Sequence, residues 1–149
     1  MLRQDGRKEP AGVTAIETAL MMIILVPLVF GIVEFGLLFY DKAMITNASR
    51  EGARAGIVYQ FDPDSERRHP GNEVITDTIN DYLENRLVTF GSAVGPTVTI
   101  SRNPVNGDAP GDRLIVDVLY RYDFLVLPNF VAGLVGGLDL TARTIMRLE

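Results

Sequence analysis

Residues 13–40, VTAIETALMMIILVPLVFGIVEFGLLFY, decide the fold of this chain. The stretch has 28 residues, and Glu17 and Glu34 are its only charged side chains. At about 1.5 Å per residue, a helix places Glu34 roughly 31 Å beyond Val13, close to the hydrocarbon thickness of about 30 Å. The sequence therefore predicts a membrane-spanning helix with a glutamate near each interface. Because an acid inside hydrocarbon costs about 2.5–3.5 kcal/mol, Glu17 needs a partner.

Residues 1–12 form a short leader before this helix, and the leader carries Arg3, Arg7 and Lys8. The positive-inside rule counts Lys and Arg far more than acids, so it places this end in the cytoplasm and exports the rest of the chain. Three basic residues after the span, at positions 42, 50 and 54, weaken this asymmetry. The apolar run is too long for an ordinary cleaved secretory signal.

Composition excludes several classes of function. The chain has 149 residues, with 14 basic and 19 acidic side chains and a net charge of -5, which argues against electrostatic nucleic-acid binding. It has no cysteine, so a disulfide framework, a thiolate nucleophile and a cysteine metal site are excluded. With the single His69, a metal site that needs two imidazoles from one chain is excluded too.

The residues around the start of the apolar run carry a family resemblance. Gly12 ends the leader, Val13 opens the helix, and Glu17 is the fifth residue after Gly12. Further matching stretches are ETAL (17–20), VP (26–27), GIVEFG (31–36) and NASREGAR (47–54). In these features the chain resembles the TadE-like minor pseudopilins of tight-adherence (Flp-type, type IVc) pilus systems.

This resemblance implies a pilin-like α+β fold and a role in pilus assembly and surface attachment. It implies cleavage between Gly12 and Val13 by a prepilin peptidase, and recognition of Glu17. The implied partners are that peptidase, other pilin-like subunits and an assembly platform in the inner membrane. No cofactor is implied.

Cleavage after Gly12 would create a positively charged amino group on Val13, which could pair with Glu17 of a neighbouring subunit. Alternatively, Glu17 is simply favoured by the helix dipole and reaches the headgroups. Pro27 removes a backbone donor and could bend the helix for packing, or it could have no special role.

Small residues form two ridges along the expected helix of residues 13–57, and small ridges permit close approach of another helix. The second ridge lies beyond the bilayer, beside Arg50, Glu51 and Arg54, so a solvated helix surface is the alternative for that part. The ridge residues are Gly31 and Gly36, then Ala48, Gly52 and Gly56.

Residues 58–149 are expected to form an exported α+β domain. Asn72 is expected to cap an amphipathic helix over Glu73–Thr89, because apolar residues recur there with helical period. Period-two alternation predicts strands from Thr97, over 114–122 and over 140–148, with a hairpin loop at 103–112. The uncharged stretch 124–138 is expected to be a short helix or an apolar loop.

The polar loops suggest little further chemistry. Asp62, Asp64 and Glu66 alternate like the start of a calcium loop but lack its glycine and distant glutamate. Asp108 and Asp112 in the hairpin loop could bind a cation, although acids in turns usually only solvate the chain. His69 is expected to be exposed. We expect no metal site and no enzymatic activity. The two rival functions are a permanently anchored scaffold or sensor that keeps its leader, and a membrane-tethered enzyme.

Overall fold

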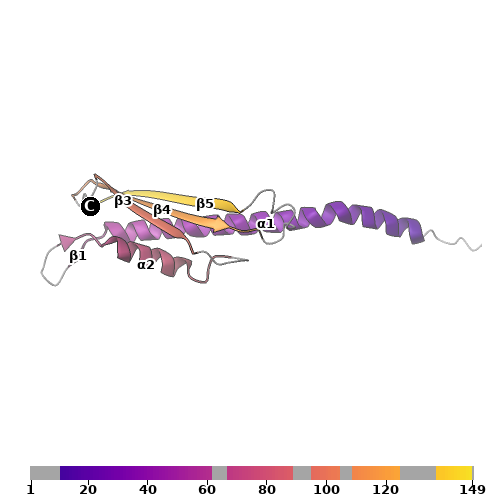
Figure 1. The fold of residues 1–149 in the computed structure, drawn as a ribbon, viewed down its shortest axis with the longest axis horizontal. Helices are drawn as coiled ribbons and strands as arrows, with labels where there is room; N and C mark the ends of the chain where they lie inside the picture. Colours follow the sequence, from indigo (N-terminus) through magenta and orange to yellow (C-terminus); the bar gives the residue numbers. More distant parts are fainter. Residues whose placement is uncertain (1–10, 62–66, 89–94, 105–108, 125–136, 149) are drawn as a thin grey trace, which may run out of the picture.

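The computed structural model describes residues 11–61, 67–88, 95–104, 109–124 and 137–148. It has the expected α+β fold, with one long helix, a second short helix and a small antiparallel sheet (Figure 1). The elements are α1 (Ala11–Ile57), β1 (Gln60–Phe61), β2 (Arg67–Arg68), α2 (Asn72–Leu83), β3 (Thr97–Asn103), β4 (Arg113–Tyr122) and β5 (Leu138–Arg147).

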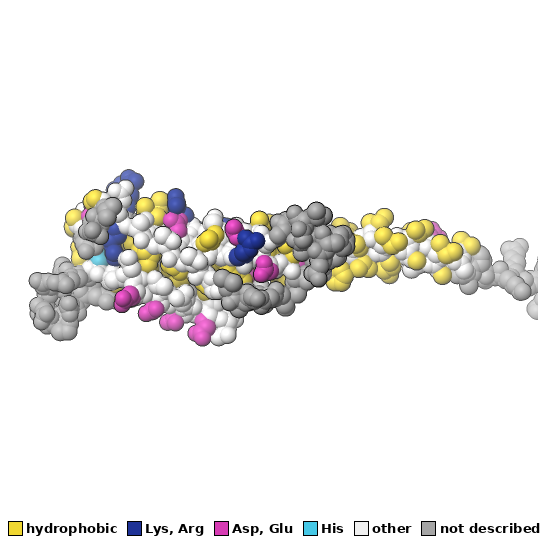
Figure 2. Space-filling view, in the orientation of Figure 1, with side chains coloured by type: hydrophobic (Ala, Val, Ile, Leu, Met, Phe, Trp, Pro, Cys, Tyr) yellow, Lys and Arg dark blue, Asp and Glu magenta, His cyan; other side chains and the backbone are white. Residues whose placement is uncertain are grey.

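Helix α1 is 47 residues long and contains Pro27 in its interior. Its N-terminal half projects away from the rest of the molecule, while its C-terminal half lies between the sheet and α2 (Figure 1). The projecting half is covered with apolar side chains (Figure 2). The chain is therefore one compact body on a bare apolar stalk.

The main sheet has the order β3-β4-β5, and both pairings are antiparallel. The expected alternation is confirmed on β4, where Leu114, Val116, Val118, Tyr120 and Tyr122 are buried. On β5, which begins at Leu138 rather than at the expected Leu140, the inward residues start with Leu140 and Ala142. One face of the sheet therefore packs on the helices, and the other face remains outside.

The core lies where α1 meets α2 and the two long strands. Small residues of α1 let the neighbouring elements approach closely, and Ile75 and Ile79 of α2 are completely buried against them. Fully burying each isoleucine contributes about 1.5–3 kcal/mol. The helix of the stalk is thus also the central core element of the domain.

Helix α2 differs from its prediction at both ends. Asn72 is its first residue and not its cap; Gly71 holds the cap position, with no side-chain hydrogen bond there. The Asn72 amide oxygen instead accepts a hydrogen bond from Arg102 at 2.9 Å. The helix ends at Leu83 rather than Thr89, because Glu84 leaves the helical conformation with a ψ of 125° and Asn85 then adopts a left-handed φ of 58°.

The expectation for His69 was wrong. His69 is buried, and its ring stacks on Tyr59 with 4.1 Å between ring centroids. The flat face of an imidazole ring packs well on an aromatic ring, so His69 is buried even though its neighbours in sequence are polar. The acids that alternate like the start of a calcium loop, Asp62, Asp64 and Glu66, lie outside the described residues, as do Asp108 and most of the uncharged stretch 124–138.

Candidate membrane and subunit interface

The bare stalk is the first candidate functional surface. Every residue from Gly12 to Phe30 is exposed, and Glu34 is the first buried residue of α1. Gly12–Val33 is 22 residues, which measures about 33 Å as a helix. This length matches one hydrocarbon core of about 30 Å. So much apolar side-chain surface is incompatible with water and requires lipid or other helices around it.

Near the start of the stalk, Gly12, Val13 and Glu17 all lie in the first turns of α1. All three are exposed, and Val13 is 63% accessible. Within the described part of the chain, Glu17 forms no ion pair or hydrogen bond. The carboxylate is therefore available to a group that another molecule supplies.

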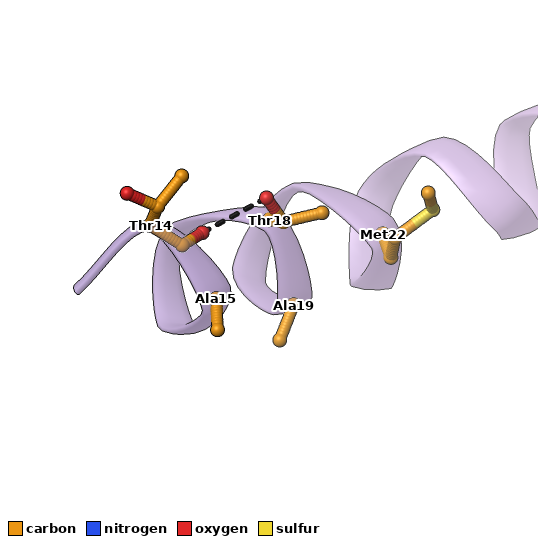
Figure 3. A pocket seen from close by; sticks show the side chains of 5 residues that line it. All are labelled: Thr14, Ala15, Thr18, Ala19 and Met22. Carbon is orange, nitrogen blue, oxygen red and sulfur yellow. Dashed lines mark hydrogen bonds between the residues drawn. The ribbon is translucent and has the colours of Figure 1, made fainter. Parts of the chain in front are cut away.

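One face of the same turns carries a shallow, open hollow lined by small side chains. Thr14 and Thr18 lie above Ala15 and Ala19 along this face, and Met22 closes its far end (Figure 3). The Thr18 hydroxyl donates to the Thr14 carbonyl at 2.9 Å, so its polarity is satisfied inside the helix. At 100° per residue, Glu17 points roughly 130° away from the centre of the hollow. The helix end thus has two distinct faces, one acidic and one small and apolar.

The junction between stalk and domain is built on a second glutamate. Glu34 is 3% exposed, and its carboxylate accepts a hydrogen bond of 2.7 Å from the hydroxyl of Tyr122, at the end of β4. Burial and the neighbouring Glu34 carboxylate both raise the pKa of Tyr122, so the phenol remains protonated and donates. Phe124 packs edge-on against the Tyr122 ring, with 5.7 Å between centroids. This contact marks where the domain begins to cover α1.

Two turns further along α1, Asp41 is completely buried as well. One carboxylate oxygen accepts a hydrogen bond from the Val88 backbone at 2.9 Å, while the other is buried without a partner among the described residues. Burial raises the pKa of Asp41, and the Val88 hydrogen bond opposes that change. Next to it, the Lys42 ammonium donates to the Thr141 carbonyl of β5. Polar groups of α1 therefore hold both the sheet and the loop after α2.

The predicted small-residue ridges have different surroundings. A Cβ on Gly31 or Gly36 would meet nothing within 4 Å, so this ridge remains open to a partner. A Cβ on Gly52 would lie 2.5 Å from Ile79, and one on Gly56 would lie 2.6 Å from Ile75 and from Leu114. The second ridge, which begins at the buried Ala48, is thus occupied by this chain's own α2 and β4.

Sequence reasoning placed Glu34 at a membrane interface and assigned no role to Asp41 or Tyr122. An available signal was the spacing of the two acids, because Glu34 and Asp41 are seven residues apart and so lie on one helix face. Nothing in the sequence indicated that Tyr122 would bind Glu34, since Tyr122 is one of several inward positions in an alternating strand. Its partner lies 88 residues away in sequence.

Together these features describe an α+β protein whose single apolar N-terminal helix fits one passage through a membrane. Residues 12–54 match a family model described as "TadE-like protein", so the resemblance to TadE-like pilins of tight-adherence systems is confirmed over that segment. No curated protein and no solved structure matches the chain. Among the described residues, no group of three or more His, Asp or Glu side chains could hold a metal ion.

Proposed function

We propose that this protein is a minor pilin-like subunit that takes part in assembling a tight-adherence type IV pilus, and through the pilus in surface attachment. The observation that carries the proposal is the bare apolar stalk with an acid, Glu17, that has no partner among the described residues and lies inside the segment that matches the TadE-like model. Its partners are a prepilin peptidase, other pilin-like subunits and an inner-membrane assembly platform.

The proposed mechanism begins with removal of the leader between Gly12 and Val13. The cut creates an α-amino group on Val13, which is positively charged near neutral pH. Within one helix this amine and Glu17 are only four residues apart, and packed helices also bring the amine of one subunit to Glu17 of its neighbour. An acid in lipid is strongly disfavoured without a counter-charge, so the pair favours one register of helix against helix.

The two faces of the stalk support assembly into an array. A neighbour that pairs with Glu17 lies on one side, while the hollow around Ala15 and Ala19 admits a second helix on another side. A contact between two different faces adds subunits in one direction, which is how filaments grow. Toward the domain, Gly36 lies on the side of the hollow and Gly31 on the side of Glu17 at 100° per residue, and both have open space around them.

In the proposed arrangement the N-terminus lies in the cytoplasm, the stalk crosses the inner membrane, and the domain is exported. The basic residues of the leader support this direction. Pro27 lies near the middle of the bare stalk and offers a place for the helix to open or bend when it leaves lipid for a filament.

The experiment is Glu17→Ala in cells that build the pilus, with Glu51→Ala as the matched control. Glu51 is an exposed acid on the same helix beyond the stalk. Glu17→Ala should still insert in the membrane, because it removes a charge from an apolar segment, but should be lost from sheared pili and from the initiating complex. Glu51→Ala should behave as wild type. Normal incorporation of Glu17→Ala would refute the pairing mechanism.

A further inference from the structure

One face of α2 carries a row of acids. Glu73, Asp77, Asp81 and Glu84 are all exposed, and their spacing of four, four and three residues places them on one side of the helix. Figure 2 shows acidic side chains in a row along this edge of the domain. None of these four acids forms an ion pair with another described residue. Like charges four residues apart repel one another, so this face favours a cationic partner.

The outer face of the sheet lies on the opposite side of α1 from α2 (Figure 1), and its outward side chains carry a net positive charge. Arg113 of β4 and Arg147 of β5 are exposed and directly opposite each other in the pairing register. Like charges in that position destabilise a sheet, and neither arginine forms an ion pair with any described residue. The outer face holds four arginines and two aspartates, a net charge of plus two: Arg113, Arg121, Arg143 and Arg147 against Asp117 and Asp139.

The two charged faces lie at the same level along α1. A Cβ on Gly56 would touch both Ile75 and Leu114, so the start of α2 and the start of β4 are level with that glycine. Glu73 is two residues before Ile75, and Arg113 directly precedes Leu114. In two copies anchored at the same depth in one membrane, the acids of one copy and the arginines of the other are therefore at equal height.

We propose that neighbouring copies of this chain associate side by side in the membrane, with the acidic face of α2 from one copy on the outer face of the sheet of the next. Glu73 and Asp77 meet Arg113 and Arg147, which relieves the repulsion within each face. The exposed side chain of Ile145 lies beside the arginines and supplies apolar contact. Because the two faces differ, each copy keeps a free face of each kind and a row of copies can form.

This contact goes beyond the proposed function and does not depend on cleavage of the leader. It concerns the domains, whereas the pairing of Glu17 concerns the stalk. The two ideas can therefore fail separately. Normal pilus incorporation of Glu17→Ala with the domain contact intact removes only the pairing mechanism of the proposed function. Loss of Glu17→Ala from pili together with absence of the domain contact removes only this contact.

Crosslinking in membranes tests the contact directly, because the natural chain has no cysteine. Two full-length variants, Asn80→Cys on the acidic side and Ile145→Cys on the sheet, keep every charge. Co-expressed and treated with a short bifunctional maleimide, they should form a mixed dimer. The double variant should form a ladder beyond the dimer. Absence of the mixed dimer, or preferential pairing of Asn80→Cys with itself, would overturn the proposal.

Charge reversal in the double-cysteine background identifies the cause of the contact. Arg113→Glu with Arg147→Glu should lower the crosslinked fraction about tenfold, and so should Glu73→Lys with Asp77→Lys, since several ion pairs are lost. Combining all four changes should restore the ladder, because the faces are again complementary. Failure of the combined variant to recover, while each pair of changes weakens crosslinking, would show that the charges do not face each other.

The matched control removes the same positive charge elsewhere. Arg50 and Arg54 are exposed on α1, so Arg50→Glu with Arg54→Glu changes the net charge as much as reversal of the sheet arginines does. This control should keep the ladder. If it lowers crosslinking equally, the effect comes from net charge and the proposed contact is wrong.

Discussion

Replacing Tyr122 with phenylalanine removes one oxygen atom from the junction between the sheet and α1. The ring is 1% exposed and keeps its packing, including the edge contact with Phe124. The change takes away the hydrogen bond of 2.7 Å that the hydroxyl donates to the buried Glu34 carboxylate. The effect on stability therefore reports the polar contact and not the loss of a side chain.

The magnitude follows from the charge and the burial. A hydrogen bond to a charged group contributes about 1.5–3 kcal/mol, and we expect the loss of this buried bond to lie within that range. With a urea m-value of about 1–3 kcal/mol per molar, the unfolding midpoint should fall by roughly 1 M. The measurement is urea unfolding of the full chain in mild detergent, followed by the near-ultraviolet circular dichroism of its tyrosines.

The matched control is Tyr82→Phe. Tyr82 is a half-buried tyrosine of α2 whose ring lies 4.7 Å from the Arg86 guanidinium, and that contact survives loss of the hydroxyl. Its midpoint should barely change. The cost of Tyr122→Phe should also shrink when Glu34 is replaced with alanine, because the two residues are coupled. Equal midpoints for Tyr122→Phe and Tyr82→Phe would refute this account of the junction.

Three more predictions concern packing, titration and orientation. Gly52→Ala should destabilise the domain by about 0–2 kcal/mol in the same urea assay, because overlap with Ile79 costs about 1–3 kcal/mol and the helix gains about 1 kcal/mol from alanine. Gly36 has open space around it, so Gly36→Ala should be neutral or stabilising. A larger loss of stability in Gly36→Ala than in Gly52→Ala would contradict this packing. The pKa of Asp41 is raised above its ordinary 3.8 in the folded chain, so this group adds stability as the pH falls from neutral toward 4. Asp41→Asn should lose this gain in stability at lower pH. An unchanged slope of the unfolding free energy against pH in Asp41→Asn would refute the prediction. A protease added outside spheroplasts should cut the domain but spare the stalk, whereas protection of the domain would reverse the proposed orientation.

The long helix and the strands were predictable because their periods are strong. Apart from Glu17, no charge interrupts the apolar run of the stalk, and alternation along β4 fixes which of its side chains are buried, so the long helix and this strand can be predicted from sequence. The similarity to TadE-like proteins could also be recognised from sequence, since Gly12 and Glu17, which carry it, are close together in the chain.

The errors arise where contacts between distant segments decide the result. His69 looked exposed because its neighbours in sequence are polar, but the aromatic ring that covers it belongs to Tyr59. The end of α2 depended on the backbone conformation of Asn85, which the apolar stripe does not record. The hydrogen bond of Glu34 was missed because its donor, Tyr122, lies far away in sequence.

The ridge from Ala48 to Gly56 is an intermediate case. Sequence indicated correctly that small residues admit another element, but it could not tell whether that element belongs to a partner or to the same chain. Ile75 and Ile79 of α2 fill the space. The apolar stripe of α2 packs on the small residues of α1. The sequence pattern of either helix does not show which element will be its packing partner.

The most direct measurement is the mass of the intact protein extracted from membranes of cells with an active prepilin peptidase. The account predicts a chain that begins at Val13, and it predicts that Gly12→Phe keeps the leader. A wild-type chain that still begins at Met1 in such cells would contradict the central claim, because no amine would then exist beside Glu17.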